Sequence, residues 1–536
     1  MPSSGIVLIS ASDTDLLAAQ TGSAQTGSAQ TGSAEPSGGP WRLANPARTA
    51  PADVPALLDG AFCVVLRLLG GRRSWPGGLD AVLASGLPAV VLSGEPSPDA
   101  ELMSLSTVPA GVAAEALAYL REGGPANLAQ LARFLSDTIL LTGEGFDPPE
   151  VLPAYGVHGG RPRLPGRPTI GIVFYRSHAV AGNTAFADML AGAVEAAGGN
   201  AVPVFCGSLR AAPQEFYDLL RGVDAVIVTV LAAGGTVAAG AAAGGDDAWD
   251  VAALAALDVP VLQALCLTTP RKTWAASSAA LTPMDAAMQV AVPEFDGRLI
   301  TVPFSFKEAG PDGIGVYTAD PERAARVAGI AVAHARLRHV PADRKRLAIM
   351  LSSYPTRHAR IGNAVGLDTP ASAVVLLQAL REAGYDLGGG FPEDGDTLIH
   401  QLIEAGGQDT EWLTEAQLAA AALRVPQREY EQWFAALPAP LQASVREHWG
   451  APPGELYTDH GDIVLAGLRF GNVIVMIQPP RGFGENPVAI YHDPDLPPSH
   501  HYLAAYRWLE QTFQADAVVH LGKHGTLEWL PGKGLG

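Results

Sequence analysis

Short apolar runs alternate with amphipathic stretches along most of this chain, and that alternation limits the possible fold more than any other feature. Apolar runs of strand length occupy residues 5–10, 62–69, 88–92, 170–174, 201–205, 225–230, 259–265 and 346–351. Stretches with helical spacing occupy residues 112–120, 128–141, 185–197, 213–220, 249–257 and 371–383. Strands that alternate with helices pack as mostly parallel sheets with helices on both faces. The sequence therefore predicts an α/β protein made of repeated doubly wound sheets.

The chain is long enough for several domains rather than one core. A Pro-, Gly- and Arg-rich passage ending at Pro168 predicts a linker. The expected parts are an α/β domain at 1–150, a second at 168–340, a third formed by 341–400 and 450–536, and a helical subdomain inserted at 401–449. In the third domain we expect strands at 463–468, 473–478, 488–491 and 518–521, and a helix at 502–513.

A low-complexity tract interrupts the first domain at 20–39. The sequence QTGSA occurs there three times, between Gln20 and Ala34. Because the tract has little apolar surface to bury, we expect a flexible surface insertion with no function of its own.

The charge balance and the cysteine pattern exclude several classes of protein. The formal net charge of −19 repels nucleic acid and anionic membrane surfaces, and no apolar run reaches membrane-spanning length. The N-terminus lacks the features of a signal peptide, which predicts a cytoplasmic protein. Cys63, Cys206 and Cys266 are widely spaced, so we expect neither a disulfide framework nor a cysteine metal site. A metal ion would therefore bind through nitrogen and oxygen.

A short motif, H-A-x-x-G-N, occurs twice just after a predicted strand. It places His178 and His358 in matching positions, with Asn183 and Asn363 at the ends of the two motifs. We interpret the pair as a duplicated strand-loop-helix unit, although two similar turns would also give this pattern. The loops are candidates to line a cleft between domains, where a large flat ligand binds. Alternatively, Gly-Asn only provides the turn into a helix.

Residues of chemical interest are dense near position 520. The apolar run 517–521 predicts a short buried strand with His520 near its carboxyl end, and Lys523, His524 and Glu528 follow on a Gly-rich loop. Ligands bind at the carboxyl ends of strands in open α/β sheets. The alternative is an ordinary strand-end loop with solvated or hydrogen-bonded histidines.

Two earlier segments have polar groups with less certain roles. Arg481 lies on a Pro- and Gly-rich loop after a predicted strand, where we expect it to be exposed and to bind a carboxylate, or simply to be solvated. Ser499 is a candidate N-cap, which would place His500 and His501 in the first turn of a helix. Neighbouring helical residues point in different directions, so a structural role is favoured over metal binding for these histidines.

Two long motifs give the chain a resemblance to a known family. HLGKHGTLEWLPGK at 520–533 and QPPRGFGENPVAIYHDPDLPPSHHYLAAYRWL at 478–509 resemble the large subunit of cobaltochelatase and the porphyrin-binding large subunit of magnesium chelatase. The resemblance implies ATP-dependent insertion of cobalt into a metal-free corrinoid, hydrogenobyrinic acid a,c-diamide, in cobalamin biosynthesis. It also implies that the chain is an N-terminal fragment, because family members continue well beyond this motif.

The resemblance also implies partner proteins. The sequence has no phosphate-binding loop of the form G-x-x-x-x-G-K-[ST], so ATP and Mg are expected to act on a AAA+ ATPase subunit and its accessory subunit. Lys523 and the 478–509 motif favour the cobalt branch over magnesium insertion into protoporphyrin. A non-catalytic small-molecule-binding protein is the alternative from another class, since repeated doubly wound domains also form receptors.

Within this interpretation, nine residues are candidates for the site. His520, His524 and Glu528 are expected to handle the metal, with one of them accepting pyrrole N–H protons. The tetrapyrrole is expected to contact Arg481, His178, His358, Asn363, Lys523 and Trp529, with the Trp529 indole stacking on the ring.

Overall fold

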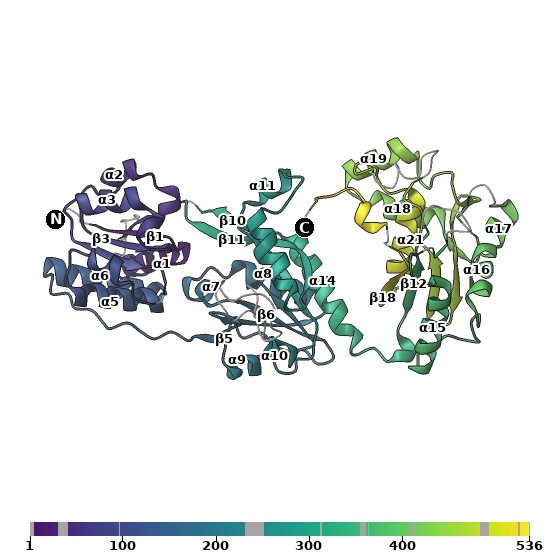
Figure 1. The fold of residues 1–536 in the computed structure, drawn as a ribbon, viewed down its shortest axis with the longest axis horizontal. Coiled ribbons are helices and arrows are strands. Elements are labelled where there is room, and N and C mark those ends of the chain that lie inside the picture. Colours follow the sequence, from purple (N-terminus) through teal and green to yellow (C-terminus); the bar gives the residue numbers. More distant parts are fainter. Residues whose placement is uncertain are drawn as a thin grey trace. The chain divides into compact units, whose positions relative to one another are not determined.

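A computed structural model describes residues 5–30, 41–95, 97–230, 251–310, 313–353, 361–362, 364–406, 408–409, 413–482, 493–523 and 526–534 (Figure 1). The chain divides into two compact units, Met1–Ala335 and Arg336–Gly534, each with its own sheets and apolar cores. The predicted domain boundaries at 150, 168 and 340 stay predictions. Among the described residues, no helix is both long and apolar enough to cross a membrane.

The first sheet of unit 1 has the order β2-β1-β3-β4, and all its pairings are parallel. Its strands are β1 (Gly5–Ser10), β2 (Trp41–Ala44), β3 (Ala61–Leu68) and β4 (Ala89–Ser93). Figure 1 shows helices on both sides: α5 (Ala110–Glu122) and α6 (Pro125–Leu140) on one, α2 (Val54–Leu58) and α3 (Pro76–Ala84) on the other. Alternate residues of β1 enter the two cores, with Ile6 in one and Val7 in the other.

The second sheet of unit 1 has the order β11-β10-β9-β8-β6-β7-β5. Five central strands are parallel, and β5 and β11 pair antiparallel at the two edges. The strands are β5 (Tyr155–Val157), β6 (Thr169–Tyr175), β7 (Asn200–Cys206), β8 (Ala225–Val228), β9 (Val261–Leu267), β10 (Leu299–Ala309) and β11 (Gly315–Ala319). Helices α8 (Ala185–Ala196) and α14 (Pro321–Leu337) contribute to the core on one face, and α9 (Gln214–Leu219) to the core on the other.

Unit 2 contains a four-stranded sheet with the order β16-β17-β12-β18. The central strand β12 (Leu347–Leu351) pairs in parallel with β17 (Val473–Ile477) and β18 (Ala517–Leu521), and β16 (Gly467–Phe470) pairs antiparallel with β17. One face packs against α15 (Thr369–Glu382) and α16 (Gly395–Glu404), the other against α18 (Gln427–Ala435) and α21 (His500–Arg507). The prediction of repeated, mostly parallel doubly wound sheets is confirmed.

The predicted helical subdomain at 401–449 is not confirmed as such. The segment contains α17 (Glu415–Ala420), α18 and α19 (Ala439–Trp449), but also the strand β13 (Leu423–Val425). β13 forms a small antiparallel sheet with β15 (Asp462–Leu465) and β14 (Thr458–Asp459). The predicted strand at 463–468 is therefore two strands, β15 and β16, which belong to different sheets. The predicted strand at 488–491 lies outside the described residues.

The QTGSA tract also differs from its prediction. Helix α1 runs from Asp13 to Gln30, so the first half of the predicted insertion continues a helix. The first turns bury Leu16, Ala18 and Ala19 against the sheet. Once those turns are fixed by packing, each further residue adds a hydrogen bond at little cost, which extends the helix into a sequence with almost no amphipathic character. Residues 31–40 lie outside the described residues.

Candidate functional site

Three loops meet at one edge of the four-stranded sheet of unit 2. They follow β12, β17 and β18, which are neighbouring parallel strands, so the carboxyl ends of all three lie on the same edge. The loops begin at Ser352, Gln478 and Gly522. This edge is the place where the sequence predicted ligand binding.

The loop after β18 approaches the loop after β12 closely. The backbone N–H of Lys523 donates to the hydroxyl of Ser352 at 3.0 Å. Gly522 has a φ of +129°, and a Cβ atom there would lie 2.3 Å from the Ser352 Oγ. Only glycine satisfies both the backbone conformation and the close approach. This contact fixes the start of the loop and leaves the Lys523 side chain exposed.

β18 is not buried as predicted, because its residues 518–520 are exposed. His520, near the end of this strand, lies beside Tyr506 of helix α21. The His520 Nε2 atom is 3.4 Å from the Tyr506 hydroxyl, and Gln478 Nε2 donates to that hydroxyl at 3.0 Å. Burial raises the pKa of Tyr506 well above its usual value, so the phenol stays protonated at neutral pH. A buried amide and a neutral phenol therefore position an accessible imidazole at the sheet edge.

A second contact holds the far end of the same loop. Tyr502, one turn before Tyr506 on α21, has its hydroxyl 3.0 Å from the Thr526 hydroxyl, and both side chains are buried. Ser499 caps α21 by accepting a hydrogen bond from the Tyr502 N–H at 3.2 Å, which confirms the predicted N-cap. Trp529 lies on the short 3₁₀ turn Leu527–Trp529, where it is half-buried.

Arg481 is not exposed, and that prediction is wrong. Its side chain is fully buried, and its Nη2 donates to the carbonyl oxygens of Asp493 and, at 3.2 Å, Leu496. Burial lowers the pKa of Arg481 from its ordinary value. The guanidinium thus joins the loop after β17 to the chain that leads into α21, and it would have to leave these carbonyls to bind a substrate carboxylate.

His500 and His501 are buried and have structural partners, as expected. His500 Nδ1 lies 2.7 Å from the Tyr430 hydroxyl, and its Nε2 lies 3.1 Å from the Gly450 carbonyl oxygen. His501 Nε2 lies 3.0 Å from the Val464 carbonyl oxygen. Burial lowers the pKa of His501 to about 4, so the ring is neutral at physiological pH. These two rings hold α21 against its neighbours.

Of the three residues predicted to bind the metal, the structure describes the side chain of one. His524 lies outside the described residues, and the same is true of the Glu528 side chain, whereas His520 is placed at the sheet edge. Where side chains are described, no three His, Cys, Asp or Glu residues converge as a metal site. The assignment of His520, His524 and Glu528 stays a prediction.

The paired histidine motifs fall in different units. His178 is half-buried on α7 (Arg176–Ala181) of unit 1, whereas His358 and Asn363 lie outside the described residues. The glycines at matching positions, Gly182 and Gly362, have similar left-handed φ values of +72° and +69°. His178 therefore belongs to a different unit from the sheet edge of unit 2, and its expected role in ring binding stays a prediction.

Sequence reasoning missed the residues that support His520. Gln478 and Tyr506 contact each other or the imidazole, and Ser352 fixes the following loop. A signal was present for Tyr506: it lies four residues after Tyr502 in a predicted helix, so the two tyrosines lie on one face. The described groups offer hydrogen bonds and one accessible imidazole, a set suited to orienting a ligand and accepting a proton.

Comparisons with known proteins point in the same direction as the motifs. A family model described as CobN/Magnesium Chelatase matches residues 117–536. The aerobic cobaltochelatase subunit CobN of Pseudomonas aeruginosa is 38% identical over 522 residues, which cover 92% of this chain and 41% of that protein. The chloroplastic magnesium-chelatase subunit ChlH of Oryza sativa subsp. indica is 32% identical over 376 residues, which cover 69% of this chain and 26% of that protein.

A solved structure is also similar over nearly the whole chain. The catalytic subunit of cobaltochelatase from Mycobacterium tuberculosis is 54% identical, with a TM-score of 0.80, and the match covers 99% of this chain and 44% of that one. The chain thus spans less than half the length of these relatives.

Proposed function

The chain belongs to the CobN/magnesium chelatase family, and from this membership we propose that it is part of a large subunit that inserts cobalt into the metal-free corrinoid hydrogenobyrinic acid a,c-diamide, in cobalamin biosynthesis. The observation that carries the choice of metal is the higher identity to cobaltochelatase subunits than to the magnesium chelatase subunit. In this proposal cobalt is a substrate. ATP and Mg act on a AAA+ ATPase subunit and its accessory subunit.

The sheet edge of unit 2 is the proposed ring site. Gly522 lets the backbone turn sharply there, and the exposed imidazole of His520 is held by the neutral Tyr506 phenol. In this proposal the Trp529 indole stacks on the flat ring, and the Lys523 ammonium pairs with an acidic side chain of the ring. Pyrrole N–H protons must leave as the ion enters, and an imidazole is the side chain that most often accepts protons in catalysis.

We propose that His520, His524 and Glu528 bind cobalt transiently and transfer it to the ring. Imidazole nitrogen and carboxylate oxygen are ligands that cobalt accepts. An incomplete set of ligands suits a protein that must release the ion, because a closed tetrahedral cage retains it.

The choice of ring is tested by absorbance titration of the complete protein with the metal-free corrinoid and with protoporphyrin. Preference for the corrinoid supports the proposal, and preference for protoporphyrin favours magnesium insertion. Binding of neither ring favours a non-catalytic small-molecule-binding protein. Ligand-stimulated ATP hydrolysis by the purified protein without partners would contradict the assignment of ATP to other subunits.

The metal-handling residues are tested by His524→Ala and Glu528→Gln in the complete protein with its ATPase partners. We expect ring affinity to be kept and cobalt insertion to be lost. His448→Ala and Glu447→Gln are matched controls, because both side chains are exposed on α19. Full insertion activity in the two test variants would remove these residues from the mechanism.

A further inference from the structure

A cavity of about 300 Å³ in unit 1 is lined by residues from both of its sheets. The first sheet contributes the carboxyl ends of β1, β3 and β4, with Ser10, Arg67 and Gly94 near them. The second contributes His178, just after β6, and the hairpin of β10 and β11. Ligands usually bind at the carboxyl ends of parallel strands. Here such strand ends from both sheets line one cavity.

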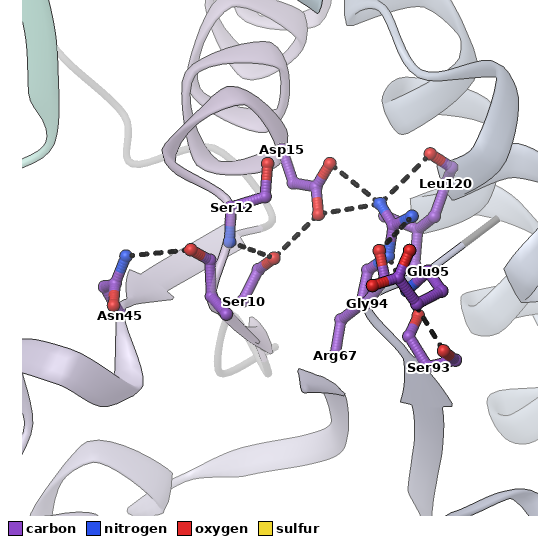
Figure 2. Close-up of polar contacts among 10 residues, drawn as sticks. Ser10, Ser12, Asp15, Asn45, Arg67, Ser93, Gly94, Glu95 and Leu120 are labelled. Atoms are coloured by element: carbon purple, nitrogen blue, oxygen red, sulfur yellow. Dashed lines mark hydrogen bonds and ion pairs between the residues drawn. The ribbon is translucent and has the colours of Figure 1, made fainter. Parts of the chain in front are cut away.

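One side of the cavity, which we call its floor, includes Ser10, Arg67 and Gly94, and Figure 2 shows the polar contacts that these residues make. Arg67 and Asp15 form a buried ion pair, with Nη1 2.9 Å from Oδ2, and each side chain is 8% exposed. Arg67 also donates to the carbonyl oxygens of Ser93 and Gly94, and Ser10 donates to Asp15 at 2.7 Å. These contacts join the ends of β1, β3 and β4, so the floor is formed before any ligand arrives.

Lys307 and Asp13 lie side by side in the cavity lining. The Asp13 carboxylate is paired twice, with Lys307 at 2.8 Å and with Arg48 at 2.5 Å. Gly315 makes room for the Lys307 pair, because a Cβ atom there would lie 2.4 Å from the Lys307 Cε and 2.7 Å from Asp13. Arg48 pairs with Asp13 from outside the cavity lining, so the Asp13 carboxylate is shared between two cations and does not belong to Lys307 alone. The Lys307 side chain is 34% exposed, which leaves ammonium hydrogens available to a ligand.

His178 faces the cavity as a neutral hydrogen-bond donor. Asn183 accepts from the Tyr317 N–H through Oδ1 at 3.3 Å, so its amide nitrogen is turned to His178 Nδ1, 3.4 Å away. Nδ1 is then an acceptor, and the ring hydrogen must be on Nε2. Burial, with a smaller contribution from the Lys307 charge, lowers the pKa of His178 to about 4, which keeps the ring neutral. The rings of Phe186 and Tyr317, both 5.2 Å away, fix its orientation.

We propose that this cavity binds a compact oxyanion, the carboxylate or phosphate group of a small metabolite, with Lys307, His178 and Tyr317 as donors. Lys307 and Tyr317 are direct partners across the hairpin, so their side chains lie on the same face. Burial raises the pKa of Tyr317 far above its usual value, so its phenol also offers a hydrogen. An ammonium, a neutral imidazole and a phenol can all donate hydrogen bonds to an oxyanion.

The volume sets the size of the ligand. About 300 Å³ is at the lower end of the range for small-molecule sites, so a small acid or phosphate fits and a whole tetrapyrrole does not. The cavity is therefore a second binding site, separate from the ring site proposed for unit 2.

The test is calorimetric titration of the whole chain with inorganic phosphate, succinate and ethanolamine at about 0.15 M ionic strength, where distant charges are screened. We expect saturable 1:1 binding of phosphate or succinate, whichever chemistry the site takes, and no binding of ethanolamine. Lys307→Met should weaken that binding at least about tenfold, the usual effect of losing a hydrogen bond to a charged group. Lys272→Met is the matched control, an exposed lysine of unit 1 outside the cavity.

A second variant, His178→Phe, tests the proposal independently in case Lys307→Met fails to fold. It keeps an aromatic ring against Phe186 and Tyr317 but removes the Nε2 donor, together with the Nδ1 contact to Asn183, so it should also weaken binding. No saturable binding of either anion, or equal binding by Lys307→Met and Lys272→Met, would overturn the proposal. Corrinoid affinity is measured in parallel, and a joint loss of corrinoid and anion binding in Lys307→Met would show that the sites are not separate.

Discussion

Replacing Arg67 by methionine should destabilise the first sheet of unit 1 strongly. The guanidinium makes bonds to both Asp15 oxygens, at 3.0 and 2.9 Å, and to the carbonyl of Leu120 at 3.3 Å. The substitution removes all of them and leaves the Asp15 carboxylate buried, with the Ser10 hydroxyl as its remaining side-chain partner among the residues drawn in Figure 2. Removing one member of a buried pair costs about 3–5 kcal/mol.

Hydrogen exchange of the β1 and β3 amides is the suitable assay, because it reports local opening in a chain with several cores. We expect the opening free energy to fall by about 3–5 kcal/mol in Arg67→Met and to recover in part in Arg67→Met with Asp15→Leu, where no charge is left buried. Arg48→Met is the control. Arg48 is 43% exposed and Asp13 keeps Lys307, so the loss should stay below about 1 kcal/mol. Equal losses in Arg67→Met and Arg48→Met would refute the reasoning.

Three further outcomes are expected. Gly522→Ala should loosen the loop after β18 by about 2 kcal/mol or more, because the new Cβ meets Ser352 in a strained backbone; unchanged exchange of the 519–523 amides would contradict this. Tyr502→Phe should lower the free energy of unfolding by about 1 kcal/mol through loss of the bond to Thr526, measured by urea unfolding of unit 2 signals. His501 is neutral when folded and protonates near its ordinary pKa when unfolded, so its contribution is complete above pH 6.5 and is lost as the pH falls toward 4. Stability should drop by up to about 3 kcal/mol over that range, and His501→Leu should flatten the drop; parallel pH profiles for the two proteins would show that another group titrates.

The sheets were predictable because their signal is local. Alternating short apolar runs and helices specify a doubly wound sheet without knowledge of distant partners, and the helix predicted at 185–197 is observed at Ala185–Ala196. The prediction of one strand at 463–468 was wrong because of a single residue. Ala466 separates two strands within this continuous apolar run. The sequence does not show that β15 leaves one sheet and β16 enters another.

The candidate site was predictable only as a location. The motif near 520 places His520 and Lys523 at a strand end, but the Ser352 contact that fixes the loop joins residues 171 positions apart. For Arg481 it is the predicted exposure that is wrong. A charged residue on a Pro- and Gly-rich loop is expected to meet solvent, yet carbonyls from a later segment surround it. Long-range partners of this kind have no periodic signature.

The order of strands in the unit 2 sheet has a consequence for synthesis on the ribosome. The central strand β12 is made first, but its neighbours β17 and β18 follow only after about 120 and 165 further residues. At about 5–20 residues per second, β12 waits on the order of ten seconds for its first partner, with both backbone edges and its apolar side chains unpaired. We therefore expect nascent chains halted before β17 to bind chaperones through 347–351, and protease protection of that strand to appear only after β17 has emerged. Protection in chains halted earlier would show that another segment covers β12 during translation.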